Sequence, residues 1–171
     1  ANLDQGAAFV FTRSGSVWTY QDDLVASDGA ASDYFGSAVD VDGDTAVVGA
    51  PNDDIGAIVD TGSAYVFARS GSIWAQTQKL AAFGGQEADE AFGDAVAVSG
   101  GYIAVAEPYN NTTVGPHVGA VWTFEYDTGS WINDMAIPVP VEAQYSYWGW
   151  DLDLDGTRMI VRLTRQCLSH L

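Results

Sequence analysis

Cysteine is nearly absent from this chain of 171 residues, and its single copy is Cys167. One cysteine cannot form a disulfide within the chain, and it cannot supply the several thiolates of a structural zinc site. The sequence therefore excludes a disulfide-stapled scaffold and a cysteine-rich metal domain. A stable fold has to come from an apolar core, for which a hydrophobic content of 47% is ample.

Basic residues are also scarce. Six Lys and Arg stand against 23 Asp and Glu, which gives a net charge of −17 at pH 7. Such a surface repels polyphosphate backbones and anionic lipids, so we expect no nucleic-acid partner. Divalent cations and basic proteins are the partners that this charge favours. The alternative is that the acidity only keeps a secreted protein soluble.

Long apolar runs and catalytic signatures are missing as well. No apolar stretch is long enough to span a bilayer, so we expect no membrane insertion. The chain has no G-x-S-x-G elbow, no Walker loop and no dinucleotide-binding fingerprint. Glu87, Asp89 and Glu90 could supply paired carboxylates for glycoside chemistry, but a solvated loop is the simpler interpretation. The sequence thus favours a protein that is not an enzyme over a polysaccharide-acting enzyme.

What the chain does contain is one block in three copies. The block is a glycine, a short apolar run ending in Phe and a Trp seven residues later, and it begins at Gly6, Gly62 and Gly119. An aromatic residue followed by glycine recurs at positions 35–36, 92–93 and 148–149. The spacings of 56 and 57 residues are typical of repeat architectures, whose units cannot bury their apolar faces alone. We predict one domain, 1–171, with repeat units at about 6–61, 62–118 and 119–171.

Each period is predicted to form four short strands. Over one full period these are residues 37–41, 45–50, 63–68 and 73–80, and the first two are joined by the hairpin signal Asp42-Gly43. Helical periodicity is absent. Four antiparallel strands in each repeat describe a propeller blade, so the predicted fold class is an all-β β-propeller. Trp18, Trp74 and Trp131 recur in register and are predicted to pack between blades.

The sequence resembles a known repeat over nearly its whole length. Phe35-Gly36, then Val47-Val48-Gly49-Ala50-Pro51, then the run from Gly62 to Phe67 resembles the FG-GAP repeat of integrin α-subunits and secreted bacterial proteins. The resemblance implies propeller blades and a secreted or cell-surface location. It also implies recognition or adhesion as the function.

The first and last repeats of the sequence each match only half of a blade. Residues 7–25 match the third and fourth strands of a blade, residues 146–163 match the first and second, and two whole blades lie between. Three blades are too few to close a ring. We therefore predict a homodimer in which the terminal half-blades complete each other and close a six-bladed ring. The alternatives are a truncated piece of a longer propeller and a purely structural, self-assembling fragment.

The loops between the second and third strands and between blades are long, acidic and free of Lys and Arg. Because long loops on a rigid scaffold commonly bind ligands, we predict that this face binds a protein or a glycan. The neighbouring aromatics Tyr145, Tyr147, Trp148 and Trp150 could stack on sugar rings, although core packing is the simpler interpretation. The predicted ligand-binding residues are Asp53, Asp54, Asp89, Glu90, Asn110, Asn111 and His117.

Oxygen-rich loops also suit Ca²⁺, the one cofactor that we consider. The candidate ligands are Asp28, Asp33, Asp53 and Asp54. Ordinary turn chemistry is the alternative explanation for these aspartates. Residues 151–156 match the start of the integrin-type calcium loop, but Arg158 and Met159 stand where its closing acid belongs. We therefore predict a plain hairpin there.

Overall fold

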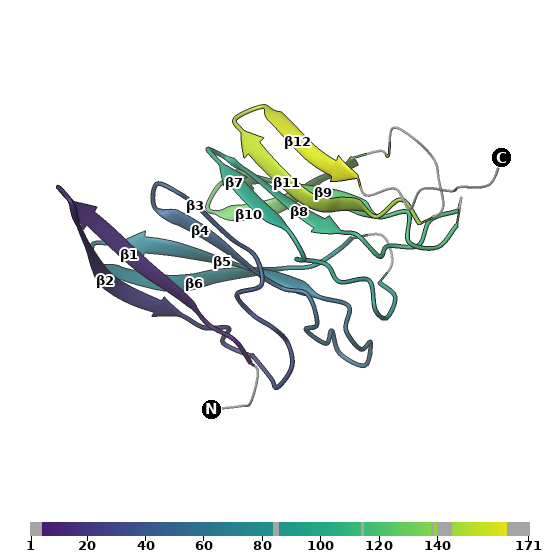
Figure 1. The fold of residues 1–171 in the computed structure, drawn as a ribbon, viewed down its shortest axis with the longest axis horizontal. Coiled ribbons are helices and arrows are strands. Elements are labelled where there is room, and N and C mark those ends of the chain that lie inside the picture. The colour runs from purple at the N-terminus through teal and green to yellow at the C-terminus, as the bar shows by residue number, and fades with distance from the viewer. Residues whose placement is uncertain (1–4, 84–85, 114, 138, 140–144, 164–171) are drawn as a thin grey trace.

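The protein folds into a row of antiparallel sheets, as a computed structural model describes for residues 5–83, 86–113, 115–137, 139 and 145–163. Two sheets are four-stranded and two are two-stranded (Figure 1). The described residues contain no helix that could cross a membrane. The all-β prediction and the phase of the repeat are both confirmed.

The strands follow the repeat. The first sheet pairs β1 (Ala8–Ser14) with β2 (Val17–Leu24). The second has the order β3 (Val39–Asp42), β4 (Thr45–Ala50), β5 (Ser63–Ser70) and β6 (Ile73–Leu80). The third has the order β7 (Val96–Ser99), β8 (Tyr102–Glu107), β9 (Ala120–Asp127) and β10 (Ser130–Ile137). The fourth pairs β11 (Trp148–Asp155) with β12 (Arg158–Leu163), so the predicted hairpin is confirmed.

The two-residue turns explain the short hairpins. Gly43, Gly100 and Gly156 lie in the left-handed region with φ between 58° and 59°, which a side chain would disfavour. Every other side chain along a strand points to the same face of its sheet. Since β4 and β8 lie in sheets that are covered on both faces, their residues are almost all buried.

Neighbouring sheets are held together by three apolar clusters. One lies between the first and second sheets and includes Leu24, Phe35 and Tyr65. The largest lies between the second and third sheets and includes Phe92, Phe124 and Trp131. The last lies between the third and fourth sheets. The apolar core therefore lies between neighbouring sheets, and each sheet contributes residues to it.

The repeated glycines lie where neighbouring sheets come closest. Gly62 forms a parallel bridge with Phe92 of the next sheet, and Gly6 and Gly119 make the same bridge with Phe35 and Trp148. A Cβ built on Gly62 would lie 2.2 Å from the carbonyl oxygen of Phe92, well inside contact distance. The repeated glycines and the repeated aromatic residues of the sequence are thus the positions where the backbones of neighbouring blades touch.

One predicted core residue is not buried. Trp74 and Trp131 are 9% and 7% exposed, whereas Trp18 is 65% exposed. Trp74 is covered by β2 of the preceding sheet, where Gln21 accepts a hydrogen bond from its Nε1–H at 3.0 Å. No sheet within the described residues covers Trp18 in this way, so the prediction that it packs between blades is wrong for the single chain.

Candidate functional site

The long connections gather at the ends of the sheets opposite the two-residue hairpins (Figure 1). They comprise the described parts of residues 25–38, 51–62, 81–95 and 108–119. This surface, called here the long-loop face, contains all the predicted ligand-binding residues. The structure divides them into a buried group, which shapes the loops, and an exposed group.

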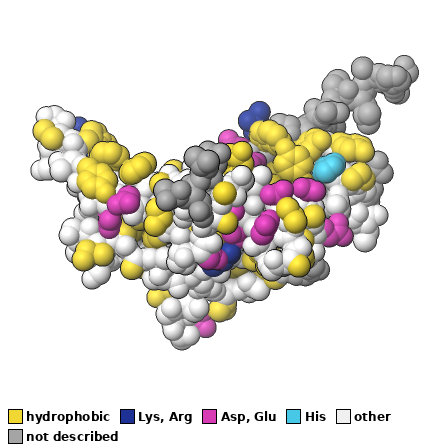
Figure 2. All heavy atoms as spheres, turned by 90° about the horizontal axis from the view of Figure 1, so that it is seen from below, with side chains coloured by type: hydrophobic (Ala, Val, Ile, Leu, Met, Phe, Trp, Pro, Cys, Tyr) yellow, Lys and Arg dark blue, Asp and Glu magenta, His cyan; other side chains and the backbone are white. Residues whose placement is uncertain are grey.

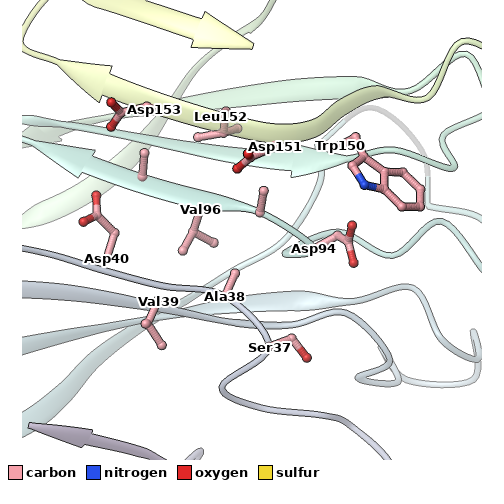
Figure 3. Close-up of a pocket in the computed structure, with 12 residues that line it drawn as sticks. Ser37, Ala38, Val39, Asp40, Asp94, Val96, Trp150, Asp151, Leu152 and Asp153 are labelled. Carbon is pink, nitrogen blue, oxygen red and sulfur yellow. The ribbon is translucent and has the colours of Figure 1, made fainter. Parts of the chain in front are cut away.

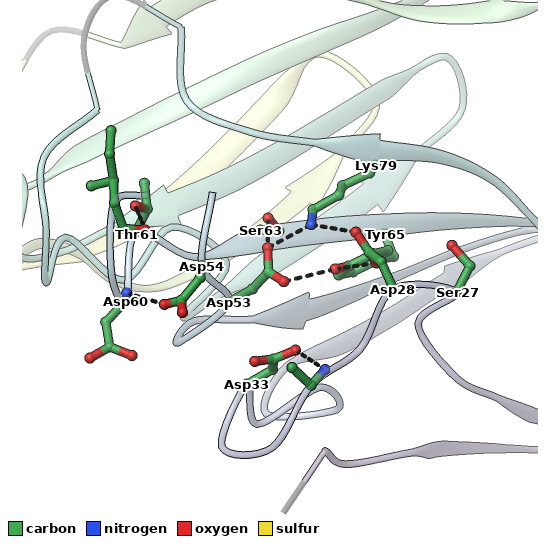
Figure 4. Close-up of polar contacts among 12 residues, drawn as sticks. Ser27, Asp28, Asp33, Asp53, Asp54, Asp60, Thr61, Ser63, Tyr65 and Lys79 are labelled. Atoms are coloured by element: carbon green, nitrogen blue, oxygen red, sulfur yellow. Dashed lines mark hydrogen bonds and ion pairs between the residues drawn. The ribbon is translucent and has the colours of Figure 1, made fainter. Parts of the chain in front are cut away.

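The first buried group surrounds Lys79, which enters from β6 (Figure 4). Its Nζ lies 2.7 Å from Asp28 Oδ2 and 2.7 Å from Asp53 Oδ2. Asp53 is only 3% exposed and also accepts hydrogen bonds from Ser63 Oγ at 2.5 Å and Tyr65 Oη at 3.2 Å. The cation therefore joins the loop after β2 to the loop after β4. The sequence analysis found no basic residue in the loops, and it did not predict that Lys79 of a neighbouring strand pairs with Asp28 and Asp53.

These contacts set the acidity of the cluster. Partial burial acts to raise the pKa of Asp28, but hydrogen bonds from Lys79 and Tyr65 hold that pKa below its ordinary value. Burial raises the pKa of Asp33, and the nearby charges of Asp53 and Asp54 add to the rise. Asp33 faces its own loop, where it accepts a hydrogen bond from the Ala30 N–H at 2.5 Å.

We expect Lys79→Met to destabilise the protein by about 2 kcal/mol, because it leaves the buried Asp53 carboxylate without its cation. Arg69→Met is the matched control. Arg69 pairs with Asp44, which is exposed, and such surface pairs contribute less than about 1 kcal/mol. Urea unfolding of both variants measures the difference. Equal losses for the two variants would show that the Lys79 pairs add nothing beyond surface electrostatics.

The second buried group occupies the equivalent place one repeat later. Glu90, 2% exposed, accepts hydrogen bonds from the Glu87 N–H at 2.8 Å and from Asn110 Nδ2 at 3.1 Å. Asn110 Nδ2 also donates to Glu107 Oε2 at 2.9 Å, and Trp122 Nε1 donates to the same oxygen at 2.6 Å. Glu107 is fully buried, and its Oε1 finds no partner among the described residues.

Burial raises the pKa of Glu107 to about 8, and the neighbouring charge of Glu90 contributes. Burial raises the pKa of Glu90 as well. A carboxyl with a pKa near neutrality suits proton transfer, but both side chains are enclosed and cannot reach a substrate. Glu90 therefore does not serve as one of two glycosidase carboxylates in this structure.

The exposed group surrounds a hollow of about 270 Å³, called here the loop-face pocket. Its lining consists of two carboxylates, two aromatic rings and two smaller residues: Asp60, Asp89, Tyr109, His117, Asn52 and Ala91. Partial burial raises the pKa of Asp60, and the charges of Asp54 and Asp89 add to the rise. The lining contains no Lys or Arg, so the carboxylates here repel one another without compensation.

An aromatic cluster borders this pocket. The His117 ring stacks on Tyr147 with centroids 5.9 Å apart and planes at 17°, and Tyr109 meets both rings edge-on. Trp150 meets Tyr109 and Tyr147, and it is 37% exposed. Figure 2 shows hydrophobic side chains gathered around a histidine beside a row of acidic side chains. Aromatic faces and carboxylates thus share one surface.

A second acidic hollow, of about 400 Å³, lies along the innermost strands β3, β7 and β11 (Figure 3). Asp40, Asp94, Asp151 and Asp153 line it. Asp40 is already engaged, since its Oδ1 accepts from the Val41 N–H at 2.8 Å and its Oδ2 from the Val98 N–H at 2.7 Å. Burial raises the pKa of Asp94. Asp40 connects successive inner strands and is not free to bind a ligand.

Two of the four predicted calcium ligands pair with an ammonium group, and the other two accept backbone hydrogen bonds. Asp28 and Asp53 bind Lys79, while Asp33 and Asp54 accept backbone N–H groups of their own loops. Within the described ranges, no group of three or more His, Cys, Asp or Glu side chains could hold a metal ion. A calcium site at these four aspartates stays a prediction.

The structure separates the other predicted ligand residues. Asp53 and Glu90 are enclosed and hold the loops in place, so neither reaches the surface. Asn111 joins its loop to the preceding long loop, since its Nδ2 donates a hydrogen bond to Glu87 Oε2 at 3.0 Å. Asp54 is exposed and fixes the loop by accepting from the Asp60 N–H at 2.9 Å. Asp89 and His117 reach the loop-face pocket.

The sequence reasoning did not select Lys79, Glu107, Asp60 or Tyr109. For Glu107 a signal was available in the sequence, because it stands where the preceding repeat has Ala50 of the Gly-Ala-Pro segment. In the structure Ala50 is completely buried, so the glutamate occupies a core position. For Lys79 the signal was its place near the end of a strand that leads toward the acidic loops. The contribution of Asp60 and Tyr109 to one pocket depends on loop conformation.

The family model described as FG-GAP repeat matches residues 18–67 and 74–124, which together make up more than half of the chain. The matched segments are consecutive, and each covers one period of the repeat: the first runs from β2 into β5 and the second from β6 into β9. No curated protein matches the sequence.

Proposed function

Because the chain belongs to the FG-GAP repeat family, whose repeats build propeller-type interaction modules, we propose that it is an extracellular recognition protein. Such repeats are typical of extracellular or surface proteins, and the family is generally non-enzymatic. We further propose that its ligand is a protein segment carrying Lys or Arg, and that this segment binds in the loop-face pocket.

The observation that supports this proposal is the mixed chemistry of the pocket. Two carboxylates, Asp60 and Asp89, lie in one hollow with the rings of Tyr109 and His117. A guanidinium group pairs with carboxylates through parallel N–H···O bonds and stacks on aromatic faces. It would also relieve the repulsion from Asp54 and Asp89 that adds to the effect of burial in raising the pKa of Asp60. The net charge of −17 would steer a basic partner toward this protein.

We expect an Arg-containing peptide to bind this protein in a titration calorimeter, and Asp60→Asn and Asp89→Asn each to weaken binding about tenfold. The control is Asp127→Asn, which removes the same charge at the exposed β9–β10 hairpin and should leave affinity within about twofold. Added salt should weaken binding, since the attraction is between charges. Equal effects of all three substitutions would show only a long-range charge effect and would contradict the proposed pocket. Binding of neutral glycans in place of basic peptides would replace the proposal with a sugar-binding function.

A further inference from the structure

The two ends of the row of sheets each present a strand with a free edge. Among the described residues, β1 pairs only with β2, and β12 pairs only with β11. Their counterparts in the second sheet, β5 and β4, pair with each other and with one further strand each. In the repeat, β1 is equivalent to β5 and β12 is equivalent to β4. The free edge of β1 therefore lacks a partner equivalent to β4, and the free edge of β12 lacks a partner equivalent to β5.

The aromatic residues of the first sheet are exposed where their repeat equivalents are buried. Phe9 is 63% exposed and Trp18 is 65% exposed. Tyr65 and Trp74 occupy the same positions one repeat later and are 0% and 9% exposed. The side chains are similar, so the difference comes from the neighbouring sheet. Large aromatic side chains exposed in this way are typical of an interaction surface.

Both ends are also hollowed. A groove of about 560 Å³ is lined by residues of β1 and by Ala46 and Val48 of β4. A smaller hollow of about 280 Å³ lies beside β12, lined by Met135, Ile137 and Met159. Ile160, which projects from β12, is 76% exposed. Each end thus offers both a projecting apolar side chain and an apolar recess.

We infer that two copies of this chain associate head to tail, with β12 of one copy lying beside β1 of the other. The repeat fixes the register. Val47 faces Val66 where β4 pairs with β5, and Ala104 faces Thr123 where β8 pairs with β9. The equivalent residues at the ends are Ile160 and Val10, so these two lie opposite each other. Ile160 then fills the groove above Ala46 and Val48, and Phe9 and Trp18 cover the smaller hollow.

Polar contacts between successive inner strands also have equivalents across the proposed seam. Asp42 Oδ2 accepts from the Gly100 N–H at 2.6 Å, and Ser99 Oγ accepts from the Gly156 N–H at 2.9 Å. Asp155 is the next acceptor in this series, and Gly43 of the second copy is the donor that it meets. One contact differs. Gln78 accepts from the Trp131 N–H at 2.9 Å, but Met135 stands at the equivalent position and meets Trp18 only through apolar contact.

Two such seams, related by a two-fold axis, close the assembly. Each copy contributes two complete four-stranded sheets, and the seams create two composite sheets. The result is a ring of six blades, within the range of four to eight that propellers adopt. Twofold closed assemblies are the commonest oligomers, and in this ring β12 and β1 each gain the neighbouring strand that they lack in the single chain.

Light scattering of the purified 171-residue protein tests the assembly. We expect a mass of twice 18.1 kDa. Phe9→Asp and Ile160→Asp should each give the mass of one chain with an unchanged circular dichroism spectrum, since both residues are exposed in the single chain. Ile73→Asp is the control, because Ile73 is 67% exposed at the β5–β6 hairpin, away from either seam. A single-chain mass for the unchanged protein would overturn the inference and assign both ends to other occupants. Masses above the dimer would overturn the closed ring.

Cross-linking tests the register. Val10→Cys and Ile160→Cys proteins, each also carrying Cys167→Ser, are mixed and oxidised. We expect an intermolecular disulfide, because directly opposed residues of antiparallel strands have Cα atoms about 4.5–5.5 Å apart, which a disulfide can bridge. Phe9→Cys is the control partner for Ile160→Cys, since adjacent strand residues point to opposite faces. A dimer that cross-links equally with both partners would contradict the proposed seam.

Discussion

Gly62→Ala is expected to lower the free energy of unfolding by at least about 3 kcal/mol. Gly62 has φ of 86°, which an L-residue adopts only under strain, and a Cβ there would meet the backbone of Phe92 in the next sheet. Because backbone atoms rather than a flexible side chain fill the space, the two sheets would have to move apart. That movement would loosen the large cluster between the second and third sheets.

Gly71→Ala separates the two causes. Gly71 also has positive φ, at 67°, but nothing lies within 4 Å of a Cβ built on it. This variant measures backbone strain alone, which costs about 1 kcal/mol. Chemical unfolding of both variants provides the comparison. If the two losses are the same, the close approach of the blades at Gly62 contributes nothing to stability.

Glu107→Gln is expected to remove a large part of the pH dependence of stability between about pH 5 and pH 8. The pKa of this carboxyl is about 8 in the folded chain and 4.5 as its ordinary value. Between these values the folded protein holds a proton that the unfolded chain has lost, so stability falls as the pH rises. The loss reaches on the order of 5 kcal/mol above pH 8. Gln is neutral and keeps an oxygen to accept from Trp122 and Asn110.

Unfolding in urea at pH 5, pH 7 and pH 8.5 measures this effect. The variant should match the unchanged protein at pH 5 and exceed it at pH 8.5. Glu125→Gln is the control, since it removes one carboxylate from an exposed position on β9 and should leave the pH slope unchanged. Parallel pH profiles for the Glu107→Gln protein and the unchanged protein would mean that Glu107 does not titrate in this range.

Strand pairing followed closely from local patterns. Asp42-Gly43 predicted the hairpin of β3 and β4, and the structure pairs Asp42 with Thr45 around that turn. The failed calcium loop at residues 151–156 was predicted to be a hairpin, which β11 and β12 form. These features depend on residues close in the sequence, whose backbone preferences act without help from distant neighbours.

The candidate site was predicted less well, because acidity in a loop does not say whether a carboxylate faces solvent. Asp53 and Asp89 look alike in the sequence, yet one is bound by Lys79 and Tyr65 and the other lines the loop-face pocket. Lys79 lies 26 residues after Asp53 and 51 after Asp28. Only the packing of β6 against the loops brings these charges together.

The sequence by itself determined the blade, its strands, its period and the positions where glycine is required, because each depends on alternation, turn chemistry and spacing along the chain. The tertiary structure decided which acids are buried, which form a pocket and why Trp18 is exposed while Trp74 is buried. Those outcomes depend on which sheet lies next to each residue. A repeat specifies the same side chains many times, but the environment of each copy is set by its neighbours in space.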